Sequence, residues 1–218
     1  FQLRSEQDRR ILDCKLTGEK LVFDASSWGR LITPVHYRDV FDALASQVQE
    51  DLAIWRMNPQ REWLGAVHLC FPNHWDPKEK VGRSFMSVHA PVAHFDKLAS
   101  IAPNLVTSMI ERGPFVRFAW GVATDNELNH HPSRPGRSFN PAEPRLFIRT
   151  ERQTLQPFAA VGASLFTIRT YFDDCSLWPK DDPRRAALIR AIEGMSPEAL
   201  AYKGLSQTRE PILAWLRA

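Results

Sequence analysis

The chain has 218 residues, of which 44% are hydrophobic and 24% are charged, and its formal net charge is +3. This composition is typical of a globular protein with one substantial core or two small ones. Basic residues are interleaved with acidic ones, which argues against a nucleic-acid-binding protein. No apolar run is long enough to cross a bilayer, and the first ten residues carry no signal-peptide pattern. The cysteines Cys14, Cys70 and Cys175 lie far apart, which favours a reducing, cytoplasmic setting and leaves no cysteine pair for an iron–sulfur cluster.

The first half of the chain predicts a helix followed by two strands. Residues 37–56 place apolar side chains at helical spacing, which predicts an amphipathic helix. The apolar run at residues 64–71 is short and bounded by turn formers, so it predicts a strand. Residues 84–89 are a second strand candidate.

The second half predicts a mixture of helices and strands. Residues 98–109 predict a helix, with Pro103 as an internal break or as its true start. Strand candidates follow at residues 115–122, 145–151 and 164–172. Prolines and polar residues at 129–141 predict a loop between the first two of these strands. Residues 181–217 predict helices, because two prolines there each follow a residue that can cap a helix. One α+β domain over residues 1–218, ending in these helices, is the simplest architecture.

Polar residues two apart on a strand share a face, because side chains alternate along a strand. This rule groups Arg149 with Glu151 on one strand and Arg169 with Tyr171 on the last strand, while Arg117 sits on a third. Two interpretations stay open. One is an antiparallel sheet with a solvated face. The other is a polar-lined site, in which arginines hold carboxylates and a Glu beside a Tyr binds an amine or relays protons.

Imidazoles, cations and aromatic residues are concentrated between residues 70 and 92, a mixture that suits a haem site. His89 is the strongest candidate metal ligand, because it ends a predicted strand and precedes an Ala-Pro pair that fixes the backbone beyond it. His74 and His94 are the reserves. Cys70 is a weaker candidate, because a cysteine in an apolar strand is usually buried filler. Motifs of zincins, c-type cytochromes, α/β-hydrolases and nucleotide-binding domains are missing from the sequence.

Several short motifs between residues 40 and 205 occur in one order. They include Trp75-Asp76-Pro77, Val88-His89-Ala90-Pro91-Val92, Arg149-Thr150-Glu151-Arg152-Gln153-Thr154-Leu155 and Tyr202-Lys203-Gly204. In this order they resemble the α-subunit family of haem-dependent oxidative N-demethylases, also called dimethylamine monooxygenases. One departure is Ala119, which stands where the family pattern has Asn; this bears on the substrate contact more than on the haem.

The resemblance implies a PAS-like fold that carries haem b, with His89 as the iron ligand. It implies O2-dependent oxidation of a small secondary amine such as dimethylamine, with release of formaldehyde. Electrons would come from NADPH through partner reductase subunits that carry flavin and an iron–sulfur centre. Four cations are candidates for holding the haem propionates: Lys80, Arg83, Arg117 and Arg149. Glu151 and Tyr171 are candidates for binding the protonated amine or relaying protons.

Two other functions compete with this interpretation. The first is a haem-binding PAS-type sensor that detects a small gas and signals through the C-terminal helices. The second is a structural interaction domain without a cofactor. A sensor needs no carboxylate near the iron, so replacement of Glu151 separates the sensor from the enzyme.

Overall fold

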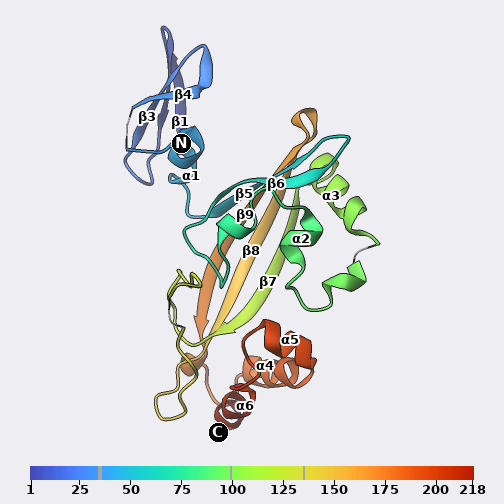
Figure 1. Ribbon diagram of the computed structural model, residues 1–218. Coiled ribbons are helices and arrows are strands. Elements are labelled where there is room, and N and C mark those ends of the chain that lie inside the picture. The colour runs from blue at the N-terminus through green and yellow to red at the C-terminus, as the bar shows by residue number, and fades with distance from the viewer. Residues whose placement is uncertain (34–35, 99, 135) are drawn as a thin grey trace. The chain divides into compact units, whose positions relative to one another are not determined.

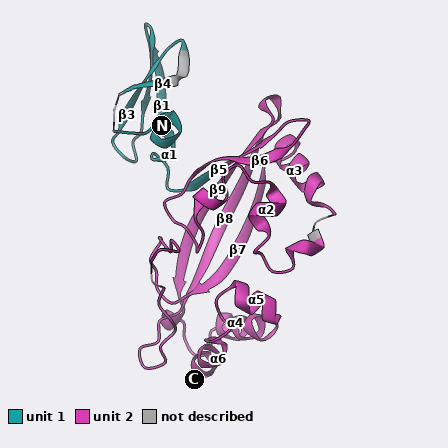
Figure 2. Ribbon diagram, in the orientation of Figure 1, with its two compact units in different colours: residues 1–52 teal, residues 53–218 magenta. Residues whose placement is uncertain are grey.

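The computed structural model describes residues 1–33, 36–98, 100–134 and 136–218, and it is a mixed α+β protein built on antiparallel sheets (Figure 1). Its contacts group into two compact units, residues 1–52 and 53–218 (Figure 2). The prediction of one haem-binding domain over the whole chain stays a prediction. Among the described residues, no helix has the length and apolar character needed to cross a membrane.

The N-terminal unit holds a four-stranded antiparallel sheet that the sequence interpretation missed. Its strands pair in chain order: β1 Gln2–Glu6, β2 Arg9–Asp13, β3 Lys20–Asp24 and β4 Ser27–Thr33. Leu21 and Phe23 alternate along β3 and are fully buried, and both belong to a small core with Ala43 of helix α1, Val40–Ala45. The period-two alternation of β3 is the signal that could have revealed this sheet.

The helix predicted over residues 37–56 is only partly correct. Helix α1 is short and begins after Asp39, whose carboxylate accepts a hydrogen bond from the backbone N–H of Asp42 at 2.8 Å. Residues Asp51–Met57 form strand β5 instead. Because β5 lies between β6 and β9, neighbours on both edges supply its backbone hydrogen bonds. This pairing outweighs the weak helical preference of the segment.

The second sheet has five strands in the order β6-β5-β9-β8-β7. Besides β5, its strands are β6 Glu62–His68, β7 Phe115–Ala123, β8 Phe147–Phe158 and β9 Ala163–Asp174. The strand predictions for these regions are therefore confirmed, although β8 runs well past residue 151. Gly162 closes the β8–β9 hairpin at φ 58°, and a Cβ there would lie 2.5 Å from the Met57 carbonyl oxygen. Only glycine fits this close approach of the hairpin to β5.

The five-stranded sheet has a covered face and an open face. The buried residues of β8 all have odd numbers: Phe147, Arg149, Gln153 and Leu155. We call their side the covered face; helix α3, Ala102–Glu111, packs on β8 and β9, and helix α2, Phe85–His89, packs on β6. The antiparallel register adds Arg117 of β7 and Thr170 of β9 to the covered face. The even-numbered side of β8, with Phe118, Trp120, Arg169 and Tyr171 beside it, is the open face.

Helix α2 replaces the strand predicted at residues 84–89. Ser84 caps it, since its hydroxyl accepts a hydrogen bond from the Ser87 backbone N–H at 3.3 Å. The carboxylate of Glu62 in β6 also accepts the Phe85 backbone N–H at 2.9 Å. The second contact comes from a distant strand, so local alternation could not reveal it. Helix α3 begins at Ala102, with Pro103 in its first turn, so the proline marks the true start.

The predicted C-terminal helices are confirmed as α4 Pro183–Glu193, α5 Pro197–Tyr202 and α6 Arg209–Arg217. Asp182 and Ser196 cap the first two through hydrogen bonds to backbone N–H groups. Ile192 and Ile212 anchor a buried cluster, against which Val122 of β7 and Ile148 of β8 pack. The helices therefore adjoin one end of the open face.

Candidate functional site

His89 ends helix α2, with its ring among three aromatic rings. The ring centroids of Phe85, Phe95 and Trp55 lie 4.2, 5.1 and 6.3 Å from that of His89. The His89 Nδ1–H donates a hydrogen bond to the Phe85 carbonyl oxygen at 2.9 Å. A carbonyl can only accept, so in the neutral ring the lone pair is on Nε2. No described residue forms a hydrogen bond with Nε2. The ring thus has the supported orientation that is usual for a metal-ligating histidine.

Burial lowers the pKa of His89, and the nearby positive charges of Arg117 and Lys80 lower it further, while the hydrogen bond to Phe85 acts in the opposite direction. The ring is therefore neutral at pH 7, which is the form that binds metals. Lys80 is fixed beside α2, because its Nζ donates to the Val88 carbonyl oxygen at 2.8 Å. Two of the four predicted propionate partners thus lie near the predicted iron ligand.

The lowered pKa of His89 predicts that the cofactor-free protein is less stable in acid. An unfolded histidine titrates near pH 6.5, so as the pH falls the unfolded state takes up the proton before the folded state does. Above about pH 7 this residue should have no effect, and below about pH 6.5 the free energy of unfolding should fall by less than about 1.4 kcal/mol per pH unit. Urea unfolding at several pH values should show a shallower decline for His89→Gln than for the wild type. Equal slopes would contradict the prediction.

A chain of polar contacts runs along the covered face from Arg117 to Arg149. Arg117 Nε donates to Gln153 Oε1 at 2.6 Å, and Gln153 Nε2 donates to Glu151 Oε2 at 2.9 Å. The other carboxylate oxygen of Glu151 forms an ion pair with Arg149 Nη1. Glu151 is therefore held from two sides by donors: Arg149 contacts its carboxylate directly, and Arg117 is linked to it through Gln153.

Arg149 is only 4% exposed and anchors this network in the sheet. Its Nη2 donates to the Phe71 carbonyl oxygen and to Thr170 Oγ1, both at 3.2 Å. Its Nε is buried and has no hydrogen-bond partner within the described part of the chain. A buried guanidinium N–H without an acceptor is unusual and is consistent with a polar group that binds there. The Asn73 amide nitrogen lies 3.5 Å from Glu151 Oε1, on the segment that also carries Phe71.

The C-terminal helices add a phenol and an amine near Glu151. Burial raises the pKa of Tyr202, and the negative charge of Glu151 raises it further. Burial lowers the pKa of Lys203, while Glu151 acts in the opposite direction. Lys203 Nζ donates to the Trp120 carbonyl oxygen at 2.6 Å. The sequence predictions gave no site role to Tyr202, Lys203 or Gln153; alternation along β8 beyond residue 151 is the signal that could have added Gln153 to Glu151.

Two predicted site residues, Tyr171 and Arg83, do not lie near the polar contacts that link Arg117 to Arg149. Glu151 lies opposite Thr170 and Tyr171 lies opposite Thr150 in the β8–β9 register, so the side chains of Glu151 and Tyr171 point to opposite faces. The expectation that they lie beside each other is wrong. Arg83 is exposed; its backbone pairs with β6, and no contact of its side chain with the cluster is found among the described residues.

The reserve ligands have other surroundings. His94 Nε2 lies 2.9 Å from the Ser196 hydroxyl, and the His74 ring stacks on His130 with centroids 5.3 Å apart. Cys70 is exposed, so the interpretation of it as buried filler is wrong. The buried thiols are Cys14 and Cys175. At Cys175, burial raises the pKa to about 12 and keeps the group protonated. No three His, Cys, Asp or Glu side chains are grouped to hold a metal ion in the described ranges.

The chain matches, over residues 1–213, the family described as haem-dependent oxidative N-demethylase, alpha subunit-like, and it belongs to that family. This confirms the family identified from the short motifs between residues 40 and 205. The match also takes in the N-terminal four-stranded sheet, which the motifs did not reach.

Proposed function

We propose that the chain is the haem-binding subunit of an oxidative N-demethylase that acts on a small secondary amine. The observation that carries this proposal is the position of His89. Its Nε2 makes no bond with the described residues, and the ring lies close to Lys80 and to Arg117, which starts the polar chain leading to Glu151. The covered face of the sheet thus combines a histidine that can ligate iron, lysine and arginine side chains that can bind the haem propionates, and a glutamate that can bind a protonated amine. We further propose that the five-stranded sheet, with helices α2 and α3 on its covered face, is a PAS-like fold and that the protein works in the cytoplasm.

The residues present fit haem b. His89 would ligate the iron, and the aromatic rings of Trp55, Phe85 and Phe95 offer flat apolar contacts. Lys80, Arg117 and Arg149 would hold the propionates, and the unpartnered Nε of Arg149 is a donor that such a carboxylate would satisfy. Arg83 is the weakest of the four candidates because its side chain is exposed away from the cluster. When bound, haem supplies O2 activation, which no side chain can provide.

The side chains of the chain itself would position the amine and handle protons. Glu151 is the acceptor that we assign to the protonated amine, since Gln153 and Arg149 hold its carboxylate in place. Tyr202, a phenol under the influence of Glu151, is better placed than Tyr171 to relay a proton. In the overall reaction, a dimethylamine-like amine, O2, NADPH and a proton give the demethylated amine, formaldehyde, NADP⁺ and water. We assign NADPH oxidation to partner reductase subunits with flavin and an iron–sulfur centre.

The proposal predicts a Soret absorbance band after reconstitution with haemin, and a shift of that band when dimethylamine is added. With hydrogen peroxide, which supplies both the oxygen atom and the oxidising equivalents, the protein should release formaldehyde from dimethylamine without a reductase. The purified protein, titrated by absorbance and assayed for formaldehyde, tests both points. A protein that takes up no haem would refute the proposal. If the protein binds haem but its Soret band does not shift with dimethylamine and no formaldehyde forms, the sensor function would be favoured.

A further inference from the structure

The open face of the five-stranded sheet exposes a group of large apolar side chains. Val116, Phe118 and Trp120 of β7 are 60%, 68% and 39% exposed, and Tyr171 of β9 is 46% exposed. Val116, Phe118 and Trp120 follow one another on the same face of β7, and Trp120 lies opposite Thr150 of β8, which separates it from Tyr171 of β9. Exposed aromatic side chains gathered on one face of a sheet are a common mark of a protein interface.

Arginines lie among these aromatic residues. Phe118 lies opposite Arg152, which in turn lies opposite Arg169, so two guanidinium groups occupy the middle of the face. The Arg169 guanidinium carbon is 5.7 Å from the Tyr171 ring centroid. Arg is enriched in interfaces because its fork binds carboxylates and its plane stacks on aromatic rings.

The same composition continues across the sheet to β5 and β6. Trp55 packs towards α2, so its neighbour Arg56 points to the open face. The Arg56 guanidinium carbon lies 5.9 Å from the Trp63 ring centroid. Both ends of the sheet therefore present aromatic rings with arginines beside them.

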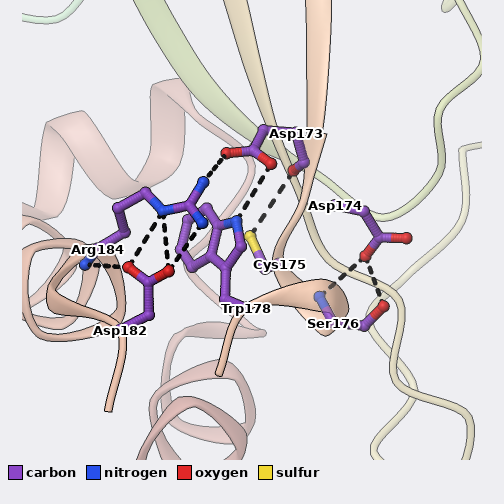
Figure 3. A network of polar contacts seen from close by, with 7 residues as sticks. All are labelled: Asp173, Asp174, Cys175, Ser176, Trp178, Asp182 and Arg184. Carbon is purple, nitrogen blue, oxygen red and sulfur yellow. Dashed lines mark hydrogen bonds and ion pairs between the residues drawn. The ribbon is translucent and has the colours of Figure 1, made fainter. Parts of the chain in front are cut away.

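Negative charge is scarce on this face and is already neutralised where it occurs. Within the five described strands, Asp173 at the end of β9 is its one carboxylate position. Asp173 Oδ2 forms an ion pair with Arg184 at 2.8 Å, and its Oδ1 accepts a hydrogen bond from Trp178 Nε1 at 3.1 Å (Figure 3). The open face therefore presents cations and aromatic rings to a partner. The one carboxylate on its described strands, that of Asp173, is already paired.

We propose that the open face docks an acidic iron–sulfur electron-transfer protein of the ferredoxin type. The proposal rests on the proposed function, which requires an electron donor. The charges select an acidic partner, because complementary potentials steer association. A second copy of this chain is disfavoured, because an isologous contact would set Arg152 and Arg169 against the same residues of the partner. The docked protein would be separated from the covered face by one sheet layer, and packed layers are about 10 Å apart.

The test is the rate at which a reduced plant-type [2Fe–2S] ferredoxin reduces the haem of the reconstituted protein, followed anaerobically by Soret absorbance. The rate should rise as ionic strength falls. Charge reversal by Arg152→Glu with Arg169→Glu should slow reduction at least about tenfold, because steering contributes factors of about 10 to 1,000. The matched control is Arg112→Glu with Arg190→Glu, which changes the net charge equally at exposed positions outside the open face. The control should react like the wild type.

Reduction by dithionite separates this proposal from the proposed function. Every variant that binds haem should be reduced by dithionite at the wild-type rate, and a protein without a Soret band would defeat the proposed function instead. If dithionite reduces the wild-type haem but ferredoxin does not, the docking proposal is overturned. Equal slowing in both double variants would overturn it too. The docking proposal would also be overturned if the wild type were a dimer and the Arg152/Arg169 double variant a monomer. Binding of a single-stranded oligonucleotide by the wild type but not by this variant would overturn it as well.

Discussion

Replacement of His89 by alanine should weaken haem binding by more than about 100-fold. Loss of a residue that merely orients a metal ligand costs about 10- to 100-fold in affinity, so loss of the ligand itself should cost more. Nδ1 is already bonded to the Phe85 carbonyl, which leaves Nε2 for the iron. Titration of the protein with haemin, followed at the Soret band, measures the change. Added imidazole should restore part of the band in the variant, because it can occupy the volume that the side chain leaves.

The reserve histidines provide the controls for this experiment. His94 bonds Ser196 and His74 stacks on His130, so alanine at either position should leave the Soret band unchanged. An unchanged band in His89→Ala, with loss of the band in one of the other two variants, would move the iron ligand to that histidine. Circular dichroism of each variant checks that the fold is retained.

Local sequence patterns were enough to predict four strands of the five-stranded sheet, β6, β7, β8 and β9, whereas β5 was predicted as part of a helix. Arg149 and Glu151 are two residues apart on β8, and they form an ion pair on the same side of the sheet as predicted. The C-terminal helices could also be predicted from the local sequence, because Asp182 and Ser196 cap them as their positions indicated. In both cases the decisive contacts lie within a few residues of each other in the sequence.

The errors arose where distant segments decide the structure. Alternation groups residues within one strand but does not fix the register between strands, so it could not show that Tyr171 faces away from Glu151. The capping of α2 by Glu62 comes from another strand, and it converts a predicted strand into the helix that presents His89. The approach of Tyr202 to Glu151 depends on how the C-terminal helices pack against the sheet. Such contacts carry no short-range sequence signal.

Substitution Glu151→Gln should abolish N-demethylation while the protein still binds haem, and it should also destabilise the fold. Glutamine keeps the shape of the side chain and removes the charge that we assign to amine binding. Arg149 is 4% exposed, so it would keep a buried charge without its counter-ion. Removing one partner of a buried ion pair lowers the free energy of unfolding by about 3–5 kcal/mol. Because the amide oxygen of Gln can still accept a hydrogen bond from Arg149, the loss in this variant should lie near the lower end of that range. Urea unfolding and the peroxide-driven formaldehyde assay measure the two effects separately.

A second variant separates the chemical role of Glu151 from its structural role. Combining Glu151→Gln with Arg149→Met removes both charges, and replacement of a whole buried pair by uncharged side chains is often neutral. The double variant should therefore regain most of the lost stability but should still form no formaldehyde. Glu143→Gln, at an exposed position, should change stability by less than about 0.5 kcal/mol and leave activity intact. Activity that returned together with stability would show that Glu151 only balances the charge of Arg149, and the amine would then need another acceptor on the covered face.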